Sequence, residues 1–180
     1  MSDKRLTLSL NISKLMFDKM KSIHGLDDRK KLLLEMSIIL HEVGYYINSK
    51  NPRMSTFDII KNLDLYGLKK DEVLLISNIV RYDELSEPTL YDSEYLRLSK
   101  KSKLIISKLI AIFRISNALD KAKKQKIKSL KIKLLDEKIL ITGQTDENVY
   151  LERWAFDKCT PFFKEVFGLK PQLIVKTLLF

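Results

Sequence analysis

Cysteine is almost absent from this chain of 180 residues, because Cys159 is the only one. A single thiol excludes an internal disulfide framework and any zinc cluster built from cysteines. No apolar run approaches the roughly 20 residues that a membrane-spanning helix needs. The N-terminus also lacks the basic and then apolar pattern of a secretory signal. These absences favour a soluble cytoplasmic protein.

Glycine and histidine are also scarce, and their scarcity limits the chemistry that we expect. The five glycines are scattered, so they cannot form a glycine-rich loop that cradles phosphate. The two histidines are His24 and His41. An H-E-x-x-H metalloprotease motif is excluded because Tyr45 stands four residues after His41. Cys159 falls within a predicted helix, with neither histidine near it in sequence, so we expect an inert thiol.

Apolar residues make up 45% of the chain, which is enough to bury a core in one domain or in one domain with a small appendage. Their spacing by three and four predicts helices over residues 8–23, 29–48, 56–63, 70–82 and 95–122. Gly25 is expected to end the first helix, and His24 beside it is expected to be a capping or surface residue. Ser55 and Asp58 match a capping box for the third helix. Residues 83–93 are acidic, contain a proline and predict a loop.

The pattern changes after residue 128. The segment SLKIKLL alternates apolar and basic residues, which predicts a half-buried strand, and ILIT predicts a second strand. Residues 149–167 predict a helix whose aromatic residues pack on the sheet, and PQLIVKTLLF predicts a third strand. The aromatic residues are Trp154, Phe156, Phe162, Phe163 and Phe167. The fold class is therefore mainly α, with a helical domain over residues 1–126 and a small β-β-α-β subdomain over residues 127–180.

Positive charge is concentrated in one segment of the chain. Residues 97–133 hold thirteen of the 33 Lys and Arg but one of the 23 Asp and Glu, Asp120. The rest of the chain is close to neutral, although the whole chain has a net charge of +10. A localised excess of this kind favours an anionic partner. The alternative is a lysine-rich surface that is simply solvated.

Six basic residues are the candidate contacts for a polyanion. Arg114, Asn117 and Lys121 fall on one predicted helical face, and lysines then crowd the passage into the first strand. The six candidates are Arg114, Lys121, Lys123, Lys124, Lys126 and Lys128. Lysine acts as a point charge that suits phosphates and reads bases poorly. Nucleic acid and simple polyphosphate therefore fit equally well.

His41 and Glu42 form the other candidate site, inside the apolar segment LLLEMSIILHEVGYYINSK. The pair has three possible roles: a satisfied core pair, a metal site or a general base. A metal site needs further imidazole or carboxylate donors. His24 and a distant Asp could supply them only if the fold brought them together. The residues alone leave these three roles open.

Five segments in order resemble the C-terminal part of the exopolyphosphatase / guanosine pentaphosphate phosphatase (Ppx/GppA) family. They are LLLEMSIILHEVGYYIN, STFDIIKNLDLYGL, ISNIVRY, LIAIFRISNALDKA and VYLERWAFDKCTPFFKEVFG. The resemblance extends from about residue 8 to residue 175. It implies an HD-domain-like helical bundle, as in HD phosphohydrolases, followed by a small α/β unit.

The departures from the family pattern affect the metal site that an HD domain would hold. A first histidine is missing near Arg5, and Glu42 replaces the Asp that follows His41. Met54 and Asp83 stand where relatives often have histidines, and Asn117 replaces the first Asp of a motif that keeps Asp120. The resemblance therefore implies a degenerate site with no metal. The alternative is a residual phosphohydrolase with Mg²⁺ or Mn²⁺ at His41, Glu42 and Asp120.

In this family the phosphatase chemistry belongs to a preceding pair of actin-like domains. The sequence begins directly in the helical part, so we expect a stand-alone or excised C-terminal domain, or one whose catalytic partner is a separate chain. The resemblance implies a polyphosphate-binding or regulatory module that is not catalytic alone. A docking subunit for a separate actin-like phosphatase is a further alternative. The apolar end LIVKTLLF is compatible with a homodimer or with simple packing on the helices.

Overall fold

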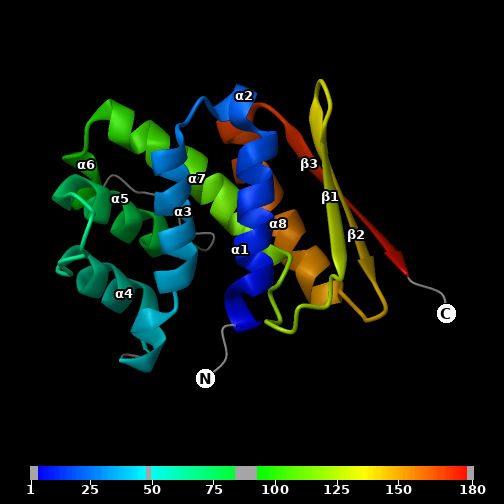
Figure 1. Cartoon of the computed structure of the whole chain (residues 1–180), viewed down its shortest axis with the longest axis horizontal. Helices are drawn as coiled ribbons and strands as arrows, with labels where there is room; N and C mark the ends of the chain where they lie inside the picture. Colours follow the sequence, from blue (N-terminus) through cyan, green and yellow to red (C-terminus); the bar gives the residue numbers. More distant parts are fainter. Residues whose placement is uncertain (1–3, 48–49, 84–92, 178–180) are drawn as a thin grey trace. The chain divides into compact units, whose positions relative to one another are not determined.

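The computed structural model describes residues 4–47, 50–83 and 93–177 (Figure 1). Most of the predicted acidic loop over residues 83–93 lies outside this part. The chain forms two compact units. One comprises Met1–Gly25 and Ala111–Phe180, and the other comprises Leu26–Ile110. The predicted boundary between residues 126 and 127 falls within the first unit and stays a prediction.

The first unit begins with two helices, α1 (Lys4–Lys19) and α2 (Lys21–His24). Gly25 ends α2 with a left-handed φ of 63°, so the predicted stop is confirmed. His24 is not a surface residue, because its side chain is 1% exposed. The capping alternative holds instead, because its ring bonds a carbonyl in the last turn of α1. Its Nε2 lies 2.8 Å from the carbonyl oxygen of Phe17, and its ring packs on the ring of Phe17. The imidazole is buried because this backbone acceptor satisfies it.

The sheet of the first unit has the strand order β1-β2-β3. β1 (Ser129–Leu134) pairs antiparallel with β2 (Lys138–Thr145), and β2 pairs parallel with β3 (Lys170–Thr177). A parallel pair needs a long crossover, which α8 (Tyr150–Phe167) supplies. The predicted β-β-α-β order is therefore confirmed.

Alternation along the strands gives the sheet two different faces. Ile132 on β1 is paired with Ile141 on β2, and both side chains are buried. Helix α8 contributes the buried rings of Phe156 and Phe163, and it packs against β3. The prediction for Trp154 is wrong, because this side chain is 55% exposed. It lies two residues from Phe156, and residues two apart on a helix project to different sides.

The second unit contains α3 (Asp28–Leu40), a 3₁₀ turn η1 (Val43–Tyr46), α4 (Pro52–Lys61), α5 (Lys70–Arg81), α6 (Ser93–Leu96) and the first half of α7 (Lys100–Ala118). The predicted helix over 29–48 is too long, because α3 ends at Leu40. The predicted helix over 95–122 is likewise divided into α6 and α7. The first difference concerns the end of a helix, and the second is a break between two helices.

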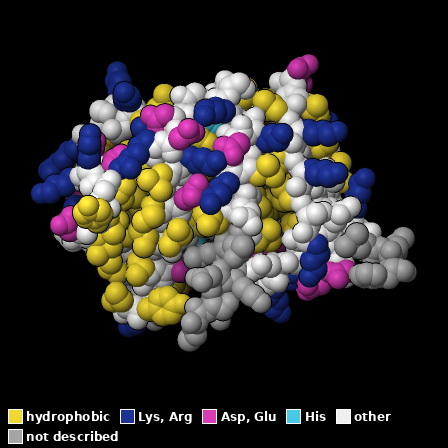
Figure 2. All heavy atoms as spheres, viewed as in Figure 1, with side chains coloured by type: hydrophobic (Ala, Val, Ile, Leu, Met, Phe, Trp, Pro, Cys, Tyr) yellow, Lys and Arg dark blue, Asp and Glu magenta, His cyan; other side chains and the backbone are white. Residues whose placement is uncertain are grey.

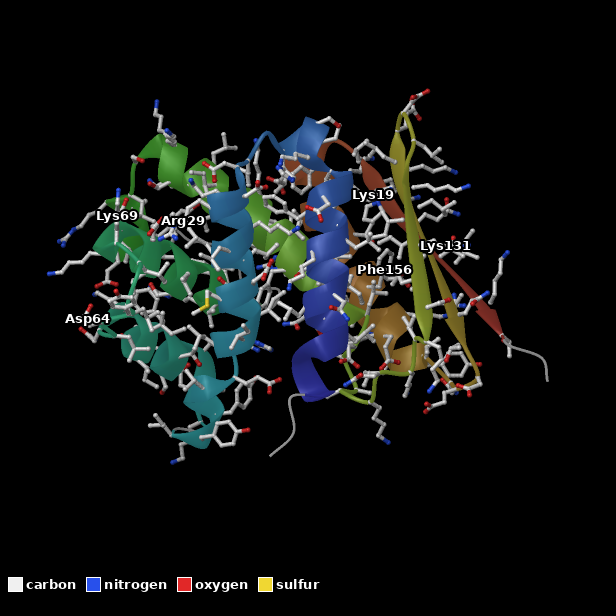
Figure 3. The ribbon with its side chains drawn as sticks, viewed as in Figure 1. Lys19, Arg29, Asp64, Lys69, Lys131 and Phe156 are labelled. Carbon is white, nitrogen blue, oxygen red and sulfur yellow. The ribbon has the colours of Figure 1, made fainter. Side chains whose placement is uncertain are left out.

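Side chains cap and connect the helices of the second unit. The capping box predicted at Ser55 and Asp58 is wrong, because Asn51 caps α4 by accepting from the backbone N–H of Met54 at 3.4 Å. Arg29 on α3, which Figure 3 labels, donates to both carboxylate oxygens of Glu72 on α5, at 2.7 Å each. This bidentate contact fixes α3 against the start of α5.

The described part of the chain is mainly helical with a small three-stranded sheet. None of its helices is both long and apolar enough to span a bilayer. The finer description as an HD-like bundle stays a prediction.

Candidate functional site

His41 and Glu42 lie just past the end of α3, not in the middle of a helix. His41 is the C-terminal cap residue of α3 and is 5% exposed. Its Nδ1 donates to the carbonyl oxygen of Ile38 at 2.6 Å, and its Nε2 lies 3.4 Å from Oε1 of Glu42. Nδ1 therefore has a hydrogen-bond partner in the backbone, and Nε2 lies near the carboxylate of the next residue. The backbone hydrogen bond of His41 is compatible with the core-pair role, which stays a prediction.

Asp120 has a backbone partner in the first unit. Its side chain is 1% exposed, and its Oδ1 accepts from the backbone N–H of Gln125 at 2.8 Å. Its backbone carbonyl accepts from Lys123 N at 2.9 Å. Asn117, one turn earlier on α7, is half-buried. Asp120 thus holds the loop that follows α7.

The donors for a metal are not assembled in the described part of the chain. Over residues 4–47, 50–83 and 93–177, no three His, Cys, Asp or Glu side chains are grouped so that they could hold an ion. Asp83, at one of the positions where the family often has histidine, accepts from Nε of Arg53 at 2.9 Å. Met54 is partly exposed and offers a thioether.

The basic residues gather in what we call the lysine loop, residues 121–128, between α7 and β1. Lys121, Lys124 and Lys128 are exposed, and Lys123 and Lys126 are half-buried. Lys123 and Gln125 have positive φ values of 54° and 51°. Non-glycine residues rarely adopt this conformation, and it persists where surrounding contacts enforce it.

Two buried carboxylates supply those contacts. Glu152 on α8 is 1% exposed and accepts from the backbone N–H of Ala122 at 3.1 Å, while Asp120 accepts from Gln125. The far end of the loop is tied to β2, because Thr145 donates its hydroxyl to the carbonyl of Lys126 at 2.8 Å. The loop is therefore held at its start, middle and end.

Part of the charge of the lysine loop is compensated within the chain. Nζ of Lys126 lies 3.5 Å from Oε2 of Glu152 and donates to the carbonyl of Asn148. Nζ of Lys128 lies 3.8 Å from a carboxylate oxygen of Asp146 and equally far from one of Glu147. The local charge pattern of the sequence does not reveal these acids, because they lie about twenty residues further along the chain. The β2–α8 connection brings them back to the loop.

Arg114 occupies a different environment from the five lysines. It lies within α7, and its side chain is 2% exposed. Its guanidinium carbon lies 4.5 Å from the ring centroid of Phe162 on α8. A cation stacked under an aromatic ring in this way stabilises the packing of α7 on α8. Contact with a large polyanion would require this side chain to move.

These features define a helical module with a small sheet, in which a fixed loop presents lysines. Residues 9–156 match the family model of the Ppx/GppA phosphatase, domain III. This match covers most of the chain, so the protein belongs to the Ppx/GppA phosphatase domain III family. A search of curated proteins finds no match.

Proposed function

We propose that this chain is a non-catalytic, regulatory or polyanion-binding module whose ligand is inorganic polyphosphate. The lysine loop is the binding site, and Lys121, Lys123 and Lys124 are among its contacts. Membership of an exopolyphosphatase-related family supports a phosphate chain as the ligand. Lysine ammonium groups bind phosphate oxygens through charge-assisted hydrogen bonds. Polyphosphate would compete for Lys126 with Glu152 and for Lys128 with Asp146 and Glu147.

The observation that carries this proposal is the way in which the lysine loop is built. Asp120 and Glu152 are each 1% exposed. Each accepts a hydrogen bond from a backbone N–H of this loop with one carboxylate oxygen. Burying a carboxylate is costly unless hydrogen bonds compensate it. A simple solvated lysine surface needs no such support. A fixed loop loses less entropy when it binds a ligand.

The degenerate metal site is part of the same proposal. Nδ1 of His41 donates to the carbonyl of Ile38, and Asp120 accepts from the backbone of the lysine loop. Each side chain therefore has a structural role. A residual phosphohydrolase would need these same side chains for a metal ion. We therefore place hydrolysis outside this chain, on a separate actin-like partner.

A second candidate function is docking onto such a phosphatase, or formation of a homodimer, and one observation favours it. Hydrophobic side chains gather over the region of α3 to α4 (Figure 2). Ile39, Tyr45, Tyr46, Ile47 and Met54 are between 36% and 82% exposed. Apolar patches of this kind often mark protein interfaces. Because the family match names a third domain, the other domains of the phosphatase are the natural partners for this patch.

The experiment is a thermal melt with and without polyphosphate at low ionic strength. The proposal predicts that polyphosphate raises the Tm, and that the effect fades by a few hundred millimolar salt because counterion release drives such binding. The triple variant Lys121→Gln, Lys123→Gln, Lys124→Gln should lose most of the shift.

A matched control removes three positive charges elsewhere. Lys70, Lys100 and Lys101 are all exposed and lie outside the lysine loop. Their replacement by Gln should leave most of the shift in place. Equal losses in the two triple variants would assign binding to net charge and refute the assigned site. Absence of any shift at low salt would refute the proposed function itself.

A further inference from the structure

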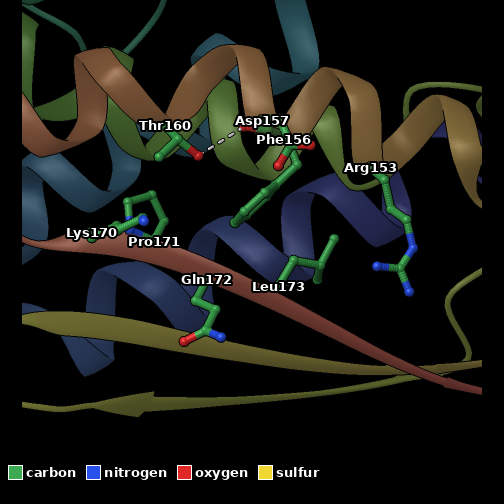
Figure 4. A pocket seen from close by; sticks show the side chains of 8 residues that line it. All are labelled: Arg153, Phe156, Asp157, Thr160, Lys170, Pro171, Gln172 and Leu173. Atoms are coloured by element: carbon green, nitrogen blue, oxygen red, sulfur yellow. Dashed lines mark hydrogen bonds between the residues drawn. The ribbon is translucent and has the colours of Figure 1, made fainter.

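A groove lies between α8 and β3 in the first unit (Figure 4). It has a volume of about 300 Å³, and the residues that line it come from one helix and one strand. Helix α8 contributes Arg153, Phe156, Asp157 and Thr160, and β3 contributes residues 170–173. Most of this groove lies after residue 156, where the family match ends.

One side of the groove is an open sheet edge. β3 pairs with β2 on one side, and among the described residues no strand pairs with its other side. β3 is eight residues long, and its one proline, Pro171, stands near its start. An open edge of this length presents backbone donors and acceptors that another strand can use. Grooves between an edge strand and a helix bind extended peptides in this way.

The two faces of the sheet differ in character, so they favour different side chains on a strand added beside β3. The outward face carries five exposed lysines from all three strands: Lys131, Lys133, Lys138, Lys170 and Lys176. None of its outward positions is acidic, and Lys138 lies directly beside Lys170 in the register. Like charges placed opposite one another destabilise a sheet. Acidic side chains on a neighbouring strand would compensate them.

The inward face is apolar beside the same edge. Pro171 is buried, Leu173 and Val175 are half-buried, and Phe156 of α8 is 2% exposed. Successive side chains of a strand point to opposite faces of its sheet. A strand added to β3 would therefore direct one set of side chains toward the lysines and the other toward α8.

We propose that the α8–β3 groove binds an extended peptide with alternating acidic and apolar residues, which joins the sheet as a fourth strand beside β3. The acidic residues lie beside Lys170 and Lys176, and the apolar residues lie over Leu173 and Phe156. A second copy of the chain is disfavoured, because it would place another basic sheet beside this one. The site is separate from the lysine loop and independent of polyphosphate.

The test measures fluorescence anisotropy of labelled peptides with the full chain. The first peptide alternates glutamate and valine over about eight residues, which matches the length of a typical strand. A second peptide has the same composition in two blocks. The proposal predicts saturable binding of the alternating peptide and clearly weaker binding of the block peptide. Equal binding of both would show that charge alone attracts them and would overturn the proposal.

N-methylation of the peptide tests for strand addition. In a strand, alternate N–H groups point to opposite sides, so only one alternate set can donate to β3. Methylating that set should abolish binding, and methylating the other set should leave it largely intact. If both methylated peptides still bind, the peptide does not form backbone hydrogen bonds with β3, and the proposal is overturned.

Protein variants locate the site. Lys170→Glu with Lys176→Glu should weaken binding of the alternating peptide by at least about fivefold, because both charges are reversed. Lys158→Glu with Lys164→Glu, at exposed positions of α8 that do not line the groove, should change it little. The Lys121, Lys123, Lys124 triple variant should also bind the peptide normally. If that triple variant loses the peptide, the lysine loop is the site and the proposal fails.

Two other occupants give different outcomes. Sedimentation that shows a dimer dissociating in the Lys170, Lys176 variant would assign the edge to a second copy. In the other outcome, a single-stranded RNA displaces the alternating peptide and binds the Lys170, Lys176 variant more weakly. That result would assign the face to nucleic acid. Either result would overturn the peptide proposal. A monomer whose peptide complex resists this RNA supports it.

Discussion

At the scale of single residues, the second unit contains a position, Gly44, where one added carbon atom would prevent the packing of η1 on α4. Gly44 in η1 is buried, and its N–H donates to Oγ1 of Thr56 on α4 at 3.0 Å. A Cβ built on Gly44 would lie within 2.5 Å of the backbone nitrogen of Thr56, and closer still to Pro52 O and Thr56 Oγ1. The turn and the helix are therefore in backbone contact.

We expect Gly44→Ala to lower the free energy of unfolding by about 2–3 kcal/mol, because the backbone of α4 would have to move. Gly67→Ala is the matched control. Gly67 has a φ of 81°, and a Cβ added there would meet no other atom within 4 Å. The free energy of unfolding of Gly67→Ala should therefore fall by only about 1 kcal/mol, from conformational strain. Urea unfolding of both variants tests this order, and a larger loss at Gly67 would contradict it.

The Arg29–Glu72 contact predicts a dependence on pH. Hydrogen bonds from the Arg29 side chain, and then from the Lys69 backbone N–H, lower the pKa of Glu72 to about 2. A carboxyl whose pKa is lower in the folded state stabilises the protein above its unfolded pKa of about 4.3, and this stabilisation disappears as the pH falls toward 2.

We therefore expect Glu72→Gln to cost about 1–2 kcal/mol at pH 7, a range typical of hydrogen bonds to a charged group at a partly exposed site. The difference from the unmodified chain should shrink steadily between pH 4.3 and pH 2. Thermal melts over this pH range measure it. A constant difference would show that the ionised carboxylate is not responsible.

At the scale of elements, the lysine loop gives Asp120 a role that can be separated from metal binding. Asp120→Ala leaves the N–H of Gln125 without its acceptor and should cost about 1–3 kcal/mol. Asp120→Asn retains an oxygen at this position and should cost less.

Neither the unmodified chain nor these two variants should respond to Mn²⁺ or to a chelator, because we assign no metal to Asp120. Melting curves recorded with Mn²⁺ and with EDTA make the comparison. A Mn²⁺-dependent rise in Tm that is lost in both variants would support the residual metal site instead.

Helix α8 carries a second testable feature, the internal Pro161. Proline has no N–H, so the carbonyl of Asp157 four residues earlier loses its helical donor. The side chain of Pro161 is exposed. Pro161→Ala should therefore raise the free energy of unfolding by about 1 kcal/mol or more. A thermal melt that shows a lower Tm would mean that the proline serves the packing of α8.

The element scale also shows what the sequence could and could not predict. Periodicity located the helices, and alternation located the strands, because both patterns reflect which side chains face a core. Helix ends were less predictable. α3 stops at Leu40 although apolar residues continue to Ile47, because Gly44 and Thr56 bring the chain into a turn that depends on contacts distant in sequence. The cap at Asn51 has the same origin.

At the scale of the whole molecule, the concentration of positive charge was predictable, but its compensation was not. The sequence places Lys126 and Lys128 in a basic segment, whereas the fold returns Asp146, Glu147 and Glu152 to them. The burial of Arg114 and His24 was also unpredictable, because it depends on partners at Phe162 and Phe17. Charge patterns in a sequence therefore indicate a partner class better than they indicate contacts.

The most direct measurement of the central claim is the affinity for long-chain polyphosphate as a function of salt concentration. If the lysine loop binds polyphosphate, the logarithm of the association constant should fall linearly with the logarithm of the salt concentration. The Lys121, Lys123, Lys124 triple variant should then have a clearly shallower slope. The Lys70, Lys100, Lys101 variant should keep the slope of the unmodified chain. Identical slopes for all three proteins would contradict the assignment of polyphosphate binding to the lysine loop.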